Sequence, residues 1–152
     1  LKRSGLSNVH PQLIQNENDI KIKRLTGKID SVLVDAPCSG VGTLRRNPDL
    51  KWRQSPAAID ELCAKQRAIL QAASALLRKC GRLVYATCSF LPEENQHIVA
   101  AFLERNPGFR LLNAAEMLAQ SGIALNTGEY FQVLPHTHAT DGFFAAAMER
   151  TG

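Results

Sequence analysis

The chain has 152 residues, 45% of them apolar and 21% charged, which is the size and composition of one globular domain. No stretch of the sequence approaches the roughly 18 consecutive apolar residues that a membrane-spanning helix needs. Eighteen lysines and arginines against 14 aspartates and glutamates give a net charge of +4, which permits a nucleic-acid partner without requiring one.

The first residues, LKRSG, contain neither an initiator methionine nor the apolar core of a secretory signal. We therefore expect a segment of a longer, cytoplasmic protein. The four cysteines show no C-x-x-C spacing, which predicts free thiols rather than a zinc site or a disulfide framework. His136 and His138 have no acidic or cysteine partner nearby in the sequence, so no metal site is predicted.

Residues 29–35 (IDSVLVD) are apolar at nearly every position, which predicts a strand buried on both faces, as in a parallel sheet. Residues 36–54 contain Pro, Gly, Asn and several basic side chains and predict a long loop. Ser55 is then placed to cap a helix that has Pro56 at its first position. Apolar residues at helical spacing continue this helix to Leu77, and Gly81 is placed to end it.

Residues 82–86 (RLVYA) predict a second buried strand. A helix is expected to begin at Pro92, with Glu93 and Glu94 at the positive end of its dipole. The remaining chain predicts a strand over 109–112, a short helix over 114–120, and a closing strand pair over 130–134 and 142–148. Strands that alternate with helices indicate an α/β fold with a mainly parallel sheet.

Two of the cysteines follow predicted strands, in Pro37-Cys38-Ser39 and Thr87-Cys88-Ser89. Ligands of open α/β sheets bind beyond the carboxyl ends of the strands, so these two thiols are candidates for one shared pocket. Cys88 also precedes a predicted helix start, where a thiolate is stabilised. Cys63 and Cys80 lie in or just after the long helix and are interpreted as small buried residues.

Three segments carry a family resemblance: DAPCSGVGTLRRNPDLKW (residues 35–52), YATCSFLPEEN (85–95) and DGFF (141–144). In this order they resemble the RNA cytosine-5 methyltransferases of the Sun/Fmu (RsmB) and NOL/NOP/Sun group, and among these the bacterial small-subunit rRNA enzymes. The resemblance covers most of residues 29–148. It implies that residues 1–152 form a single, partial catalytic domain with an incomplete Rossmann-like, S-adenosylmethionine-dependent methyltransferase fold.

The resemblance also implies the chemistry. In this family a cysteine thiolate adds to C6 of cytosine, which makes C5 nucleophilic enough to take a methyl group from S-adenosylmethionine. Cys88 is implied as this nucleophile, and Cys38 as the second cysteine, which assists release of the covalent adduct. Asp35 is implied to hydrogen-bond the N3 edge of the base and to border the cofactor. The alternative for Asp35 is a solvated acid at a strand end.

Family members carry a Gly-rich turn and a ribose-binding acid on the first two strands of a sheet ordered 3-2-1-4-5-7-6, and neither occurs in these residues. Residues 8–15 would then correspond to the third strand. Asn16, Glu17 and Asp19 compete for the adenine-side position that follows it, and Asn16 is taken as the candidate cofactor ligand. Because half of the cofactor pocket is missing, we expect this chain alone to be inactive.

Basic residues cluster in the loop after Cys38: Arg45, Arg46, Lys51 and Arg53, with Trp52 among them. The cluster is interpreted as an RNA contact, most simply with rRNA, in which arginines bind phosphates and the indole stacks on a base. The alternative is an ordinary solvated loop.

Without the first two strands, the strand over 29–35 has an open apolar edge, which is an association hazard. We expect this edge to pair with a second copy of the chain or to receive residues 6–15. The alternative function, from another class, is a non-catalytic RNA-binding or interaction module that keeps the remaining fold and the basic loop.

Overall fold

The computed structural model describes residues 5–125 and 127–152. Within these residues the strands are β1 (Ile29–Asp35), β2 (Leu77–Thr87), β3 (Phe109–Leu112), β4 (Phe131–Val133) and β5 (Phe143–Arg150). The helices are α1 (Ile20–Lys23), α2 (Leu50–Arg53), α3 (Pro56–Ser74), α4 (Gln96–Arg105), α5 (Ala114–Gln120) and α6 (Pro135–His138), with a 3-10 turn η1 (Val41–Thr43). No helix of the described residues is long and apolar enough to cross a membrane.

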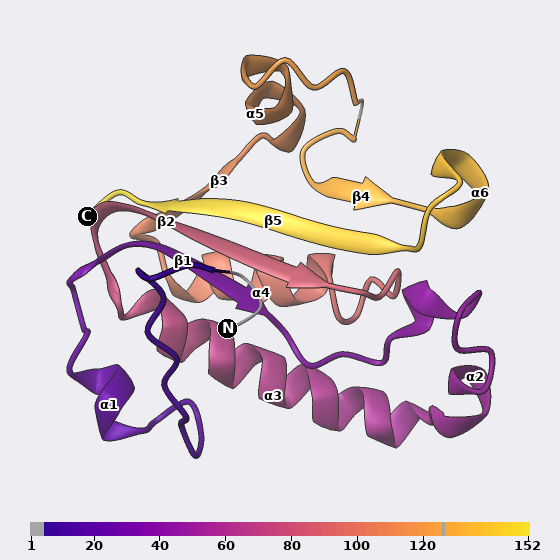
Figure 1. Cartoon of the computed structure of the whole chain (residues 1–152), viewed down its shortest axis with the longest axis horizontal. Helices are drawn as coiled ribbons and strands as arrows, with labels where there is room; N and C mark the ends of the chain where they lie inside the picture. Colours follow the sequence, from indigo (N-terminus) through magenta and orange to yellow (C-terminus); the bar gives the residue numbers. More distant parts are fainter. Residues whose placement is uncertain (1–4, 126) are drawn as a thin grey trace.

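The strands form one sheet in the order β1-β2-β5-β3, and β4 pairs with the same edge of β5 as β3 does (Figure 1). The predicted α/β fold is confirmed, but the sheet is mixed rather than mainly parallel. Only β1 and β2 are parallel, because α3 supplies the long crossover that a parallel pair requires. β5 runs antiparallel to β2, β3 and β4.

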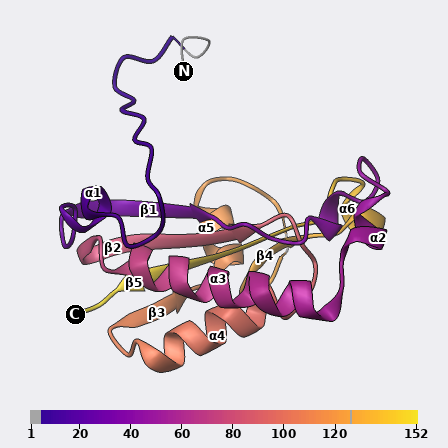
Figure 2. The same ribbon diagram turned by 90° about the horizontal axis from the view of Figure 1, so that it is seen from below.

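Two helices cover one face of the sheet, and a third covers part of the other. α3 lies under β1 and β2, and α4 lies beside α3 and under β3 (Figure 2). Their buried residues, among them Leu70 and Ile98, pack against Leu83 and Tyr85 of β2 in one hydrophobic core. On the opposite face, Met117 of α5 lines a hollow together with residues of β2 and β5.

β1 lies where the sequence predicts it, but the prediction that both of its faces are buried is wrong. Val34 is buried on the α3 side, whereas Leu33 on the other side is 69% exposed. α5 covers β2 and β5 and does not reach β1, which explains the difference. In the described chain β1 pairs only with β2, so its outer edge is open.

The segment before α1 does not fill that edge. Residues 8–15 form no strand, so their assignment as a third strand is wrong. In Figure 2 this segment extends away from β1 instead of running along it. The expected docking of residues 6–15 as a neighbouring strand is therefore not seen.

The start of α3 is as predicted, and its end is not. Ser55 caps the helix, its Oγ accepting a hydrogen bond from the N–H of Ala58 at 3.2 Å. The helix ends at Ser74, before Gly81. The carbonyl of Leu76 accepts hydrogen bonds from the N–H groups of Lys28 and Ile29, so the chain continues from there as β2 beside β1. Cys80 lies in this irregular start of β2 with φ 60°, and it is exposed rather than buried as predicted.

Candidate functional site

The carboxyl ends of β1 and β2 bring two thiols together. The strands are in parallel register with Asp35 opposite Ala86, so the chain leaves both strands at the same edge of the sheet. Cys38 lies three residues beyond β1 and Cys88 one residue beyond β2. Their Sγ atoms are 3.3 Å apart. The structure thus assembles the pair of strand-end thiols that the sequence singles out.

The thiols of Cys38 and Cys63 lie in different environments. Burial, and then the hydrogen bond with Cys88, raise the pKa of the Cys38 thiol to about 12. Cys38 therefore stays protonated at neutral pH and can donate a hydrogen bond to the sulfur of Cys88. Cys63 is 5% exposed in the core, as predicted, and donates a weak hydrogen bond to the carbonyl of Glu93.

A buried carboxylate joins the two cysteine segments. Glu94 is fully buried and accepts hydrogen bonds from the Ser39 N–H at 2.8 Å, the Ser39 hydroxyl at 2.5 Å and the Gln66 amide at 3.1 Å. The predicted helix start at Pro92 is wrong, because residues 92–95 form turns and α4 begins at Gln96. The Glu94 side chain points to the cysteine loops rather than serving a helix end.

Further hydrogen bonds fix the segment that carries Cys88. The Tyr85 hydroxyl donates to the carbonyl of Glu94 at 2.6 Å, and burial raises the pKa of Tyr85, which keeps it a neutral donor. The Thr87 hydroxyl donates to Asn95 Oδ1 at 2.5 Å. Asn95 Nδ2 in turn donates to the carbonyl of Ser89 at 2.9 Å. Cys88 thus lies between two anchored residues.

Two glycines lock the closing loop of the chain onto the thiol site. The N–H of Gly42 donates to the carbonyl of Cys88 at 3.0 Å, and the N–H of Gly142 donates to the carbonyl of Gly42 at 2.8 Å. A Cβ atom on Gly42 would lie 2.1 Å from the carbonyl oxygen of Gly142. Only glycine allows the three backbones to approach this closely.

Asp141 of the DGFF segment anchors part of the basic loop. It is 6% exposed, and its Oδ2 lies 2.7 Å from Arg46 Nε, with Arg45 Nη2 3.6 Å from Oδ1. The side chains of Arg45 and Arg46 remain 62% and 69% exposed. Both can therefore still meet an anion while being held from behind.

The other basic residues of the loop lie around the tryptophan. Trp52 is 80% exposed, and Lys51 Nζ lies 4.7 Å from the centroid of its ring. Arg53 pairs with Asp49 at 2.6 Å. An exposed aromatic ring among cations is the arrangement that single-stranded nucleic-acid sites use.

The two predicted cofactor residues do not line a common hollow. Asp35 is exposed at the end of β1, and within the described residues its carboxylate makes no hydrogen bond or ion pair. Asn16 lines a separate hollow of about 500 Å³ formed by residues 15–21, and its Oδ1 accepts from the N–H of Asn18. Of its competitors, Asp19 is occupied as the cap of α1, where hydrogen bonds from backbone N–H groups lower its pKa.

The two histidines of the 136–138 segment have different surroundings, and His136 lines a hollow together with Phe90 and Pro135. His138 Nδ1 accepts a hydrogen bond from the N–H of Leu134 at 3.0 Å and so stabilises α6.

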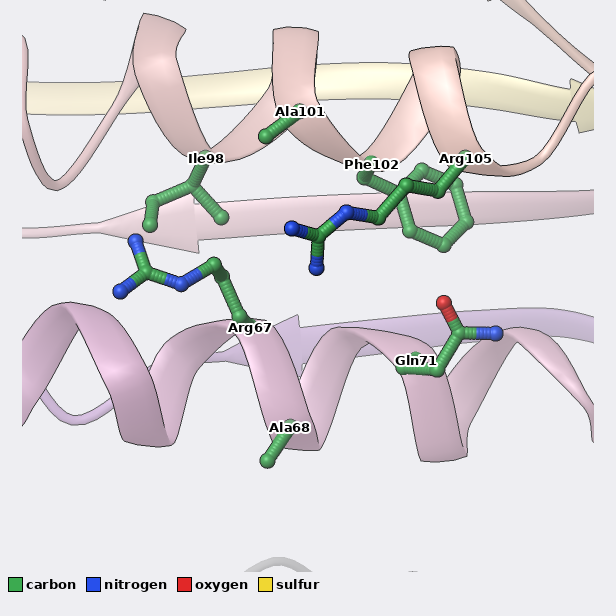
Figure 3. Close-up of a pocket in the computed structure, with 7 residues that line it drawn as sticks. All are labelled: Arg67, Ala68, Gln71, Ile98, Ala101, Phe102 and Arg105. Atoms are coloured by element: carbon green, nitrogen blue, oxygen red, sulfur yellow. The ribbon is translucent and has the colours of Figure 1, made fainter.

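A groove of about 260 Å³ lies between α3 and α4, where Arg67 and Arg105 face each other over Ile98 and Phe102 (Figure 3). Cys38 and Cys88 do not line this groove.

Comparison with known proteins assigns the family. A family model described as 16S rRNA methyltransferase RsmB/F matches residues 2–149. The chain belongs to this family. The probable ribosomal RNA small subunit methyltransferase B of Synechocystis sp. is 41% identical over 122 residues, covering 80% of this chain and 27% of the relative. The chain therefore spans about a quarter of the length of the curated relatives it matches.

Two solved structures share the fold of this RsmB/F chain. The crystal structure of PH0851 has a TM-score of 0.85 and 34% identity, and the match covers 98% of this chain and 32% of that one. NSun6 from Pyrococcus horikoshii, solved with SFG, has a TM-score of 0.77 and 28% identity, over 99% of this chain and 37% of that one. The predicted methyltransferase fold is thereby confirmed.

The sequence did not reveal that Glu94 connects the cysteine loops or that Asp141 holds Arg46. The resemblance already places Glu93 and Glu94 near the pocket, but helix-dipole reasoning explains these acids in another way and does not give their partners. For Asp141 the signal is an acid beside Gly142 in a segment that the fold places against the basic loop. Neither contact has a sequence spacing from which it could be predicted.

Proposed function

We propose that this chain is the thiol-bearing part of an enzyme that transfers a methyl group from S-adenosylmethionine to C5 of cytosine in RNA, through a covalent bond between Cys88 and C6. The observation that carries the proposal is the 3.3 Å approach of Cys38 and Cys88 at the ends of neighbouring parallel strands. The names of the relatives, which are small-subunit rRNA methyltransferases, favour rRNA as the substrate.

The roles of the residues follow from their chemistry. The Cys88 thiolate forms a bond to C6, and the electron pair of the C5–C6 double bond moves to C5 while Asp35 holds the N3 edge of the ring. When bound, S-adenosylmethionine would supply to C5 the methyl group of its sulfonium and would leave as the neutral thioether, S-adenosylhomocysteine. A base then takes the proton from C5, the Cys88–C6 bond breaks, and the ring double bond is restored. Cys38, a neutral thiol beside Cys88, donates a hydrogen bond to the departing sulfur.

The described residues fit the methyl donor at Asp35. Its carboxylate is exposed at the end of β1, three residues before Cys38, and in the described part of the chain it is engaged by no other group, so it is free to accept hydrogen bonds from a ligand. NSun6, the relative solved with SFG, an analogue of S-adenosylmethionine, supports the same donor for this chain. Asn16 is kept as the proposed adenine-side residue.

The basic loop supplies the proposed RNA contact. Arg45 and Arg46 are held by Asp141 with their guanidinium groups exposed, and Lys51 and Trp52 present a cation beside an aromatic face. Arg53 extends the same surface. Together they form a positive rim beyond the thiols, suited to phosphates and an unstacked base.

A test that needs no methyl donor suits this chain. RNA in which 5-azacytidine replaces cytidine has a more electrophilic C6, so a thiolate can add there even when no methyl donor is bound. We expect the wild-type chain to form an RNA–protein adduct that survives denaturation, with the RNA attached to Cys88 in peptide mapping. Cys88→Ala should form none.

Cys80→Ala is the matched control, because Cys80 is an exposed thiol near the start of β2, the strand that leads to Cys88, and it is not part of the pair. It should give as much adduct as the wild type. An adduct that persists in Cys88→Ala would contradict the assignment of the nucleophile. RNA binding with no adduct in any variant would favour the non-catalytic binding module instead.

A further inference from the structure

The environment of Glu94 is unusual for a carboxylate. Its side chain is fully buried, and among the described residues it has no ion pair with a lysine or arginine. A buried charge without a cation needs hydrogen-bond donors to offset the loss of water. Glu94 has three, and two of them come from one residue, Ser39, which directly follows Cys38.

These hydrogen bonds connect parts of the chain that are far apart in the sequence. Ser39 and Glu94 are separated by 55 residues, and the carboxylate binds both the N–H and the hydroxyl of Ser39. The third donor, Gln66 of α3, also donates to the carbonyl of Pro37 at 2.9 Å. The residues on either side of Cys38 are thus held by one network.

The same network reaches the segment of Cys88. Ser89 Oγ lies 3.3 Å from Ser39 Oγ, so the residues that follow the two cysteines meet. The Tyr85 hydroxyl holds the Glu94 main chain from β2. Outside this network, the side-chain amide of Gln54 donates a hydrogen bond to the carbonyl of Ser39 at 2.9 Å.

We propose that Glu94 is the positioning residue of the thiol pair: by binding Ser39 it holds Cys38 against Cys88. Its meaning for catalysis rests on the proposed function, but the positioning itself concerns this chain alone. Glu94 touches neither thiol and acts through Ser39.

The experiment measures how fast the two thiols can be joined. Diamide oxidises two neighbouring thiols to a disulfide, taking up their two electrons and two protons to become the corresponding hydrazine. Mass spectrometry of the digested protein follows the Cys38–Cys88 disulfide, and alkylation of exposed Cys80 in the same sample serves as an internal reference. No RNA or methyl donor is needed.

In Glu94→Ala we expect the disulfide to form about tenfold more slowly than in the wild type, the order of a lost hydrogen bond to a charged group. Glu94→Gln should restore most of the rate. Its amide oxygen can accept from the Ser39 N–H and its amide N–H₂ can donate to the Ser39 hydroxyl. Glu93→Ala, at the exposed neighbouring acid, should leave the rate unchanged.

A purely structural role would lower stability without changing disulfide formation relative to Cys80 alkylation. Wild-type rates in a folded Glu94→Ala, judged by far-UV circular dichroism, would overturn the inference. If Glu94→Ala does not fold, Ser39→Ala decides: slower disulfide formation supports the inference, and an unchanged rate overturns it. Absence of the 5-azacytidine adduct would instead count against the proposed function and leave this result standing.

Discussion

The thiol of Cys38 lies 3.3 Å from that of Cys88 in a strongly perturbing environment. Cys38 is enclosed between the two loops, and its burial together with its contact to Cys88 raises its pKa to about 12. A nucleophile must be a thiolate, so this environment suits Cys38 to the role of a proton-bearing partner. The role proposed for Cys38 in release of the adduct rests on this protonated state.

The raised pKa of Cys38 can be tested by alkylation. The ordinary pKa of a cysteine thiol is 9.0. With iodoacetamide at about that pH, exposed Cys80 should react and Cys38 should stay unmodified, because the pKa of Cys38 in the folded protein lies well above it. The raised pKa means that the unfolded chain loses this proton first as the pH rises. The contribution of Cys38 to stability is therefore present below pH 9 and is lost as the pH rises to about 12.

Peptide mapping after timed alkylation checks this prediction, with denatured protein as the reference for full reactivity. Cys38 should react only after denaturation. Modification of Cys38 as fast as Cys80 in the native protein would contradict it.

At this scale the sequence predicts part of the site. Cys38 and Cys88 can be singled out because each follows a recognisable strand, and parallel strands end at a common edge. Glu94 and Asp141 lie in segments that carry the family resemblance, and the resemblance places Glu94 near the pocket. Their contacts could not be predicted, since each contact joins loops across a long stretch of chain and depends on backbone turns that have no periodic signature.

Among the elements, η1, the Cys88 segment and the loop before β5 meet at a junction where the backbones are in close contact. The Gly42 position has no room for a side chain, because a Cβ there would lie 2.1 Å from the carbonyl oxygen of Gly142 and 2.8 Å from that of Cys88. All of these neighbours are backbone, which cannot rotate aside.

Gly42→Ala should therefore lower the free energy of unfolding by about 2 kcal/mol or more, as overpacking of a rigid site does. It should also weaken the hydrogen bond to the Cys88 carbonyl. Chemical denaturation followed by circular dichroism measures the change. Gly108→Ala is the matched control, because a Cβ there meets no atom within 4 Å, and its effect should stay within about 0.5 kcal/mol.

The elements also show where sequence patterns reach their limit. The strand over 109–112 and the helix over 114–120 are predicted with their observed bounds. The sequence predicts the end of α3 too late in the chain, because Leu76 and Leu77 fit a helical pattern as well as a buried strand. The pairing of Ile29 with Leu77 decides between them, and that contact lies 48 positions away in the chain.

At the scale of the whole molecule, the open edge of β1 is the main departure from a closed fold. Leu33 is 69% exposed on the uncovered face beside that edge, and Leu13, Ile20 and Leu25 of the preceding segment are also exposed. Exposed apolar strand edges favour association with other chains.

We therefore expect this chain to self-associate through β1 at high concentration. Leu33→Lys should shift the equilibrium towards the monomer, because a charged residue beside an open edge opposes pairing. Analytical ultracentrifugation of both proteins over a range of concentrations measures this. Trp52→Ala, which removes an exposed apolar side chain elsewhere, is the control. A wild-type chain that stays monomeric throughout would contradict the prediction.

Trp52 has one more consequence. It is the only tryptophan of the chain, it is 80% exposed, and a lysine ammonium lies over its ring. Because its ring is this exposed, its fluorescence should resemble that of an indole in water, so that unfolding should shift the emission wavelength little, whereas a base stacked on the ring should quench it. Trp52 fluorescence would therefore report the binding of RNA bases at the basic loop, while its emission wavelength would reveal little about unfolding.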